Sequence, residues 1–193
     1  MAKSKKILVL LGHPDKETTC GSFAGAYEEG AKKIGHEVKR VNLGDLNFDP
    51  ILHKGYKVIQ DLEPDLVALQ NDFRWAEHIV LVYPNWWGTM PALLKGLFDR
   101  FYLPGFAFRF WKNGYGWDKL LKGRTGRVFI TMDANPWLAR ILFGDNSNEI
   151  RSAIFGFAGI DARVTKIGPL KDAKPEKKEK WKKKIFEMGE KAK

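Results

Sequence analysis

Short apolar runs alternate with stretches of helical periodicity along the whole chain. Residues 7–11 are a continuous apolar run, which is typical of a strand covered on both faces. Strands that alternate with helices in this way predict a parallel sheet with helices on both faces. The expected strands are 7–11, 37–43, 78–83, 127–132 and 163–167, and the expected helices are 23–34, 61–76, 91–102, 147–158 and one that begins near Pro175.

Five strands leave few ways to connect the sheet once every crossover is right-handed. They fit the flavodoxin-like strand order 2-1-3-4-5 better than the six-stranded order of dinucleotide-binding domains. A chain of 193 residues has the size of one domain, and no repeat or low-complexity linker divides it. We therefore expect one doubly wound α/β domain over residues 1–193, with its ligand site at the carboxyl ends of the strands.

Composition and charge exclude several classes of function. No run of 18 apolar residues is present, so no membrane-spanning helix is expected. The single cysteine, Cys20, excludes an internal disulfide framework and suits the cytoplasm. Much of the net charge of +10 lies in the lysine-rich stretch 171–184, which has the spacing of a helix with a solvated basic face. Because no base-reading motif accompanies this charge, no nucleic-acid partner is expected.

Three loops follow strands that meet at the switch point of such a sheet. The first, residues 12–21, opens the first helix, and Thr18 and Thr19 are candidate N-caps there. Free amides and hydroxyls at a helix N-terminus bind anions, and His13 and Lys16 would add positive charge to a bound phosphate. Ordinary helix capping by exposed polar residues is the alternative. The loop has neither a P-loop nor a Gly-x-Gly-x-x-Gly pattern, which argues against a nucleoside triphosphatase and a Rossmann site.

Two adjacent tryptophans, Trp86 and Trp87, follow the third strand. Aromatic side chains at the carboxyl end of a central strand are expected either to cover a planar ligand or to cap the core. After the fourth strand, residues 131–136 form a turn that can direct backbone amides at a ring edge. The alternative is that Asp133 or Asn135 caps the next segment. A phosphate site in the first loop, with aromatic and amide walls in the other two, suits a flavin.

At these residues the chain resembles the NAD(P)H:quinone oxidoreductase family, of the flavodoxin-like fold and DT-diaphorase type. The family's first loop has a His-Pro pair and a phosphate-binding serine, which His13, Pro14 and Thr18 match conservatively. Residues 105–108 resemble a loop that, in the family, crosses a dimer interface and covers the partner's flavin. They lie in the connection 103–122, which is longer than usual and therefore expected to be functional. The family's most specific motif is Pro-x-x-Trp-x-x-x-Pro-x-x-Leu-Lys with a following Asp-Arg or Glu-Arg. The residues of this chain that match it are Pro84, Trp87, Pro91, Leu94, Lys95, Asp99 and Arg100.

The resemblance implies a homodimeric, flavin-dependent NAD(P)H dehydrogenase that reduces quinones or similar planar acceptors by ping-pong hydride transfer. FMN or FAD would be bound non-covalently and would carry the chemistry, which leaves the identity of any catalytic side chain open, and no metal is expected. The residues expected at the flavin are His13, Thr18, Thr19, Cys20, Pro84, Asn85, Trp86, Trp87, Gly88, Thr131, Met132, Asp133 and Ala134. Those expected at the substrate are Phe106, Phe108, Phe110, Trp137 and Phe143.

The chain also departs from the family pattern. The tyrosine and histidine that assist reduction in the family fall on Trp137 and Phe143, neither of which can relay a proton. The family's fourth loop often has two glycines where this chain has Asp133 and Ala134. These departures keep a second function open, that of an ancillary regulatory subunit of a potassium-efflux system. A third is a flavodoxin-type electron carrier, although such carriers are usually acidic and this chain has a net charge of +10.

Overall fold

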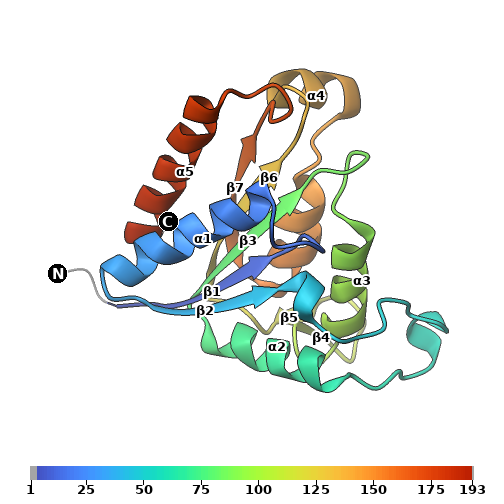
Figure 1. Cartoon of the computed structure of the whole chain (residues 1–193). Coiled ribbons are helices and arrows are strands. Elements are labelled where there is room, and N and C mark those ends of the chain that lie inside the picture. Colours follow the sequence, from blue (N-terminus) through green and yellow to red (C-terminus); the bar gives the residue numbers. More distant parts are fainter. Residues whose placement is uncertain (1–3, 193) are drawn as a thin grey trace.

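A five-stranded parallel sheet forms the centre of the computed structural model, which describes residues 4–192 (Figure 1). The strand order is β2-β1-β3-β6-β7, which confirms the predicted order 2-1-3-4-5 and the flavodoxin-like fold. Strand β1 lies between β2 and β3. The connection after β1 leads to β2 and the connection after β3 leads to β6, so the two loops run in opposite directions and leave a crevice between them. The strands are β1 Lys6–Leu11, β2 Glu37–Asn42, β3 His78–Pro84, β6 Thr125–Thr131 and β7 Asp161–Ile167.

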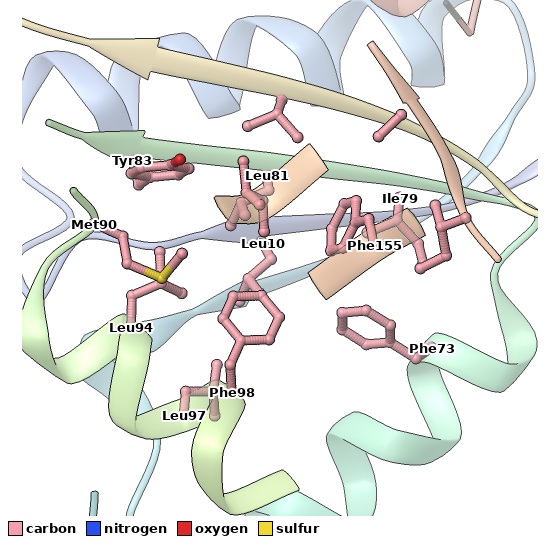
Figure 2. Packing of buried hydrophobic residues seen from close by; sticks show 14 of the residues in the cluster. Leu10, Phe73, Ile79, Leu81, Tyr83, Met90, Leu94, Leu97, Phe98 and Phe155 are labelled. Carbon is pink, nitrogen blue, oxygen red and sulfur yellow. The ribbon is translucent and has the colours of Figure 1, made fainter. Parts of the chain in front are cut away.

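Side chains of the central strands alternate between two cores, one on each face of the sheet. Val9 belongs to the core beneath α1 and α5, whereas its neighbour Leu10 belongs to the core beneath α2, α3 and η3. Figure 2 shows the second core, where Phe98 and Phe155 pack near the β3 side chains. The helices named here are α1 Thr19–Lys33, α5 Pro175–Glu190, α2 Pro64–Trp75, α3 Ala92–Phe101 and η3 Glu149–Gly156.

Helices α1 and α5 lie side by side because glycines let their backbones approach closely (Figure 1). A Cβ atom on Gly30 would lie 2.1 Å from the carbonyl oxygen of Phe186. A Cβ atom on Gly189 would lie 2.3 Å from the carbonyl oxygen of Tyr27. No larger residue fits at either position without moving one helix, so this close contact depends on both glycines.

Helix boundaries follow from capping residues and prolines. Thr18 precedes α1, and its side chain accepts a hydrogen bond from the N–H of Gly21 at 3.2 Å, which makes it the N-cap. Helix α2 begins at Pro64 rather than at residue 61, because proline suits the first helical position and the residue before it, Glu63, is extended. Helix α5 begins at Pro175, as expected.

Three segments differ from the sequence expectations. The connection 103–122 contains an antiparallel hairpin of β4 (Phe108–Phe110) and β5 (Trp117–Lys119). A short helix, α4 (Pro136–Phe143), was not predicted, because an apolar run this short can equally be a strand or a buried helix segment. The expected helix 147–158 is wound as a π-helix over η3. Two 3-10 turns, η1 (Leu43–Asp45) and η2 (Gly55–Lys57), lie between β2 and α2.

Arg100 on α3 anchors the long connection between β2 and α2. Its side chain is only 1% exposed. The guanidinium donates to both carboxylate oxygens of Glu63, at 3.1 and 3.0 Å, and to the carbonyl oxygens of Asp49 and Asp61, at 2.5 and 2.7 Å. Removal of either charged partner would leave the other charge without its ion pair, so this network holds the connection against α3.

Candidate functional site

Two adjoining hollows open at the carboxyl end of the sheet. They share Asn85, Met132 and Asp133, and together they touch all the residues predicted at the flavin. The smaller hollow, of about 200 Å³, is lined by His13, Thr18, Thr19, Cys20, Pro84, Asn85, Trp86, Thr131, Met132, Asp133 and Leu170. The larger hollow, of about 850 Å³, is lined by Asn85, Trp87, Gly88, Met132, Asp133, Ala134, Ala139, Phe143, Gly144 and Asn146.

The smaller hollow lies at the N-terminus of α1. Because Thr18 caps the N–H of Gly21, the N–H groups of Thr19 and Cys20 are left without a partner inside the helix. Both residues line the hollow. A helix N-terminus with free amides beside a threonine hydroxyl can bind a phosphate group. Helix capping was the alternative interpretation of this loop. Thr18 does cap α1, and the N–H groups of Thr19 and Cys20 still remain available to a ligand.

His13 and Lys16 have different positions in the first loop. The Nδ1 of His13 accepts a hydrogen bond from the N–H of Asp15 at 2.9 Å, so the neutral ring carries its proton on Nε2. Its ring lies edge-on to Trp86, with 5.4 Å between the ring centroids, and lines the smaller hollow. Lys16 instead forms an ion pair with Asp45 at 3.3 Å and does not line the hollow. This corrects the expectation that Lys16 adds charge at the site.

Cys20 is a buried packing residue of the smaller hollow. Its Sγ lies 3.1 Å from the Oγ1 of Thr131, which is also buried. Burial raises the pKa of the Cys20 thiol to about 11, against the weaker lowering effect of the hydrogen bond with Thr131. The thiol therefore stays protonated at neutral pH and is unsuited to nucleophilic chemistry.

The turn after β3 presents Trp87 to solvent in a strained backbone conformation. Trp86 and Thr89 exchange two backbone hydrogen bonds, at 2.9 and 3.1 Å, around the two central residues of the turn. Those residues, Trp87 and Gly88, have φ of 54° and 85°, which is the pattern of a type I′ turn. A left-handed conformation is costly for tryptophan, yet the Trp87 side chain is fully exposed and gains no packing in return. Trp87 therefore does not cap the core, and its position fits a ligand wall.

The turn after β6 presents free amides to both hollows. Asn135 caps α4, since its side chain accepts a hydrogen bond from the N–H of Trp137 at 2.9 Å. Asp133 does not cap the helix and lies exposed. Within residues 4–192, the N–H groups of Asp133 and Ala134 donate no hydrogen bond. The turn can therefore offer two donors to a ring edge while Asn135 serves the helix.

Helix α4 separates the predicted substrate residues. Ala139 and Phe143, four residues apart on one helix face, line the larger hollow. Trp137 lies on another face and lines a different hollow, beside β7. Of the two α4 residues predicted at the substrate, Phe143 therefore borders the larger hollow and Trp137 does not.

Phe106, Phe108 and Phe110 line neither hollow of their own chain. Phe106 is only 4% exposed and packs in the core, with its ring centroid 5.7 Å from that of Phe101. This corrects the expectation that it reaches into a slot, because its ring is enclosed by its own chain. Phe108 is half-buried against Phe157, and Phe110 is exposed.

Four lining residues have no signal in the sequence. Leu170 reaches the smaller hollow from the segment after β7, where its N–H donates to the carbonyl oxygen of Met132 at 3.0 Å. Ala139, Gly144 and Asn146 line the larger hollow from α4 and the segment after it. The Asn135-Pro136 pair is typical of a helix start, and a helix predicted from it would place these three residues near the site.

Two kinds of feature are absent from residues 4–192. No three His, Cys, Asp or Glu side chains in this part of the chain are grouped so that they could hold a metal ion. No helix there combines the length and apolar character that a membrane crossing requires.

Known proteins resemble this chain along most of its length. The sequence model of a family described as "Flavodoxin-like fold" matches residues 5–186. An uncharacterized NAD(P)H oxidoreductase of Haemophilus influenzae is 34% identical over 162 residues, which cover 80% of this chain and 78% of that protein. The NAD(P)H dehydrogenase (quinone) 1 of Rattus norvegicus is 25% identical, over 96% of this chain and 78% of its own. An FMN-dependent NADH-azoreductase from Bacillus anthracis, in complex with FMN, has the same fold, with a TM-score of 0.75, 20% identity, and coverage of 97% of this chain and 98% of that one.

Proposed function

This chain belongs to the flavodoxin-like family of NAD(P)H oxidoreductases, and from that premise we propose that it reduces quinones or similar planar acceptors by ping-pong hydride transfer. It is a flavin-dependent enzyme of the NAD(P)H dehydrogenase (quinone) type. The observation that carries the proposal is the pair of adjoining hollows, which joins a helix N-terminus to an aromatic-walled cavity at the switch point of the sheet. FMN, the flavin of the azoreductase complex, is the proposed cofactor.

The residues of the two hollows fit FMN at both ends. The hydroxyl of Thr18, the free N–H groups of Thr19 and Cys20, and the Nε2 of His13 would hold the phosphate. Trp87, with an exposed side chain that packs on nothing in its own chain, would hold the ring system from the larger hollow. Once bound, the flavin supplies the redox chemistry, accepting a hydride from NAD(P)H and passing two electrons to the acceptor.

The chain itself supplies orientation and electrostatic stabilisation. The N–H groups of Asp133 and Ala134, which border the larger hollow, would stabilise negative charge that develops at a ring edge. Asp133 is the one ionisable side chain among the described lining residues of that hollow. Since Phe143 cannot carry a proton, the proton for the acceptor would come from water.

A second copy of the chain is the proposed cover of the larger hollow. Contiguous exposed apolar side chains mark interaction surfaces. Phe110 and the hairpin that carries it are the proposed cover from the partner, as the resemblance implies. The exposed apolar side chains of α4 and the neighbouring turn that do not line the hollow beside β7 are Trp87, Leu138, Ile141, Leu142 and Phe143. Light scattering should show a dimer, and Leu142→Glu should yield monomers that retain less FMN; a monomeric wild type would contradict the proposal.

Initial-rate measurements with NADH or NADPH and a soluble quinone test the mechanism. A ping-pong enzyme gives parallel lines in double-reciprocal plots, because the oxidised nucleotide leaves before the acceptor binds. Intersecting lines would show that both substrates bind together and would contradict the proposal. Trp87→Ala should lower both FMN content and turnover, and turnover per bound FMN separates a loss of binding from a loss of chemistry.

A further inference from the structure

A third hollow, of about 700 Å³, lies along the edge strand β7. Helix α4 separates it from the cofactor site, because Trp137 and Arg140 line this hollow whereas Ala139 and Phe143 line the larger one. We call it the β7 groove. Its charged lining residues are Arg140, Arg151, Arg163, Lys166, Asp145 and Asp161.

The charges of the β7 groove leave a positive excess. Lys166 is paired with Asp145 at 2.7 Å, and Ser147 also donates to that carboxylate, at 2.5 Å. These hydrogen bonds, the one from Lys166 foremost, hold the pKa of Asp145 well below its usual range, so this carboxylate stays ionised at neutral pH. One further carboxylate, that of Asp161, lines the groove.

The three arginines of the groove come from three different elements. Arg140 lies on α4, Arg151 on η3 and Arg163 on β7. Within residues 4–192, none of the three forms an ion pair. Planar guanidinium groups bind phosphate oxygens through two parallel hydrogen bonds, and several together favour a doubly charged phosphate. The groove therefore suits a phosphate monoester.

Trp137 gives the groove a flat apolar face. Its side chain is 71% exposed, although it lies beside the arginines. An exposed indole can stack on a nucleobase, and arginines nearby can hold the phosphate attached to its ribose. The combination fits the adenosine end of a nucleotide better than a free phosphate ion, which needs no aromatic surface.

We propose that the β7 groove binds the adenosine 2′-phosphate end of NADPH and so selects NADPH over NADH, an inference that rests on the proposed function. The groove and the cofactor site are one peptide bond apart at Asp145 and Asn146, which line one hollow each. A nicotinamide in the larger hollow belongs to an extended dinucleotide whose other end must lie outside that hollow. NADPH differs from NADH only by the 2′-phosphate, so a preference for NADPH requires groups that bind this phosphate, and the three arginines are such groups.

Calorimetric titration with adenosine 2′,5′-bisphosphate and with adenosine 5′-monophosphate tests the proposal. The bisphosphate should bind about tenfold or more tightly than the monophosphate, since it alone carries the 2′-phosphate. Arg163→Gln and Arg151→Gln should each remove most of this preference and leave the monophosphate affinity unchanged. Trp137→Ala should weaken both ligands equally. Equal affinity of the wild type for the two ligands would overturn the proposal.

Steady-state kinetics distinguish a failure of this inference from a failure of the proposed function. In the Arg163→Gln enzyme, kcat/KM for NADPH should fall about tenfold while kcat/KM for NADH stays unchanged. Arg74→Gln, on α2 and away from the groove, is the matched control and should change neither value. If the enzyme works equally well with both nucleotides and Arg163→Gln changes nothing, the proposed function stands and the inference falls. If the protein binds no flavin, the calorimetric preference still decides the groove.

Discussion

Replacement of Trp87 by glycine is expected to stabilise the flavin-free protein while it weakens FMN binding. The Trp87 side chain is fully exposed, so its loss removes no buried apolar area from the free chain. Its φ of 54° is left-handed, which costs about 1–2 kcal/mol for a residue with a side chain. Glycine avoids this cost but loses roughly 0.5–1 kcal/mol more conformational entropy on folding. The net gain is about 0–1.5 kcal/mol, which corresponds to a rise in Tm of up to about 6 °C at this chain length.

The effect on FMN has the opposite sign. Stacking of a planar ring on an aromatic side chain contributes about 1–3 kcal/mol, so Trp87→Gly should weaken FMN binding roughly tenfold or more. Trp87→Ala keeps the left-handed strain, and should therefore lose the same affinity without the gain in Tm. Tyr56→Gly, also at an exposed aromatic residue but outside both hollows, should lower Tm slightly and leave FMN affinity unchanged.

Thermal unfolding of flavin-free protein and fluorescence titration with FMN measure the two quantities separately. Flavin must be removed first, because a ligand that binds only the folded state raises Tm by mass action. A fall in Tm of several degrees in Trp87→Gly would show that Trp87 packs against its own chain. Unchanged FMN affinity would show that Trp87 is not part of the site. Either result would refute the reasoning.

Three further predictions concern the fold that carries the site. Arg100→Gln should lower the unfolding free energy by about 3–5 kcal/mol in urea titrations, and a loss below about 1 kcal/mol would show that the buried network is dispensable. Gly30→Ala should destabilise the protein by about 1–3 kcal/mol, because the added Cβ atom would clash with Phe186. The control Gly25→Ala adds a Cβ atom that meets nothing within 4 Å, and it should stabilise the protein by up to about 1 kcal/mol. Equal effects of the two substitutions would contradict the α1–α5 packing. Burial lowers the pKa of His78 to about 3, so the unfolded chain binds a proton that the native chain does not, and the unfolding free energy should fall by about 1.4 kcal/mol per pH unit below about pH 6.5. His78→Gln should remove this part of the slope, and an identical pH dependence in the variant would show that His78 does not cause it.

The strands and their order could be predicted from local patterns, because burial on both faces leaves a direct mark on the sequence. Residues 7–11 and 79–83 are continuous runs of apolar and aromatic residues, and both form fully covered central strands. The residues predicted at the flavin could be found for the same reason. Each lies at or after the carboxyl end of a predicted strand, and the strand order brings those loops together.

The failures concern contacts that sequence spacing does not encode. Lys16 was expected at a phosphate, yet its partner Asp45 lies 29 residues away, in a loop whose position depends on the folded sheet. The family resemblance of residues 105–108 places Phe106 at a partner's site, and a sequence does not show whether a phenylalanine is exposed or buried. Its burial depends on Phe73 and Phe101, which belong to α2 and α3. Trp137 lies at a different hollow because it belongs to α4, a helix that was not predicted. The position of a residue along a helix decides which face its side chain shares with others.

Calorimetric titration of the flavin-free protein with FMN, and separately with riboflavin, tests the central claim most directly. The two hollows at the carboxyl end of the sheet predict one FMN bound per chain. They also predict that riboflavin, which lacks the phosphate held at the N-terminus of α1, binds about tenfold or more weakly. Absence of FMN binding, or equal affinity for FMN and riboflavin, would contradict the assignment of these hollows to the cofactor.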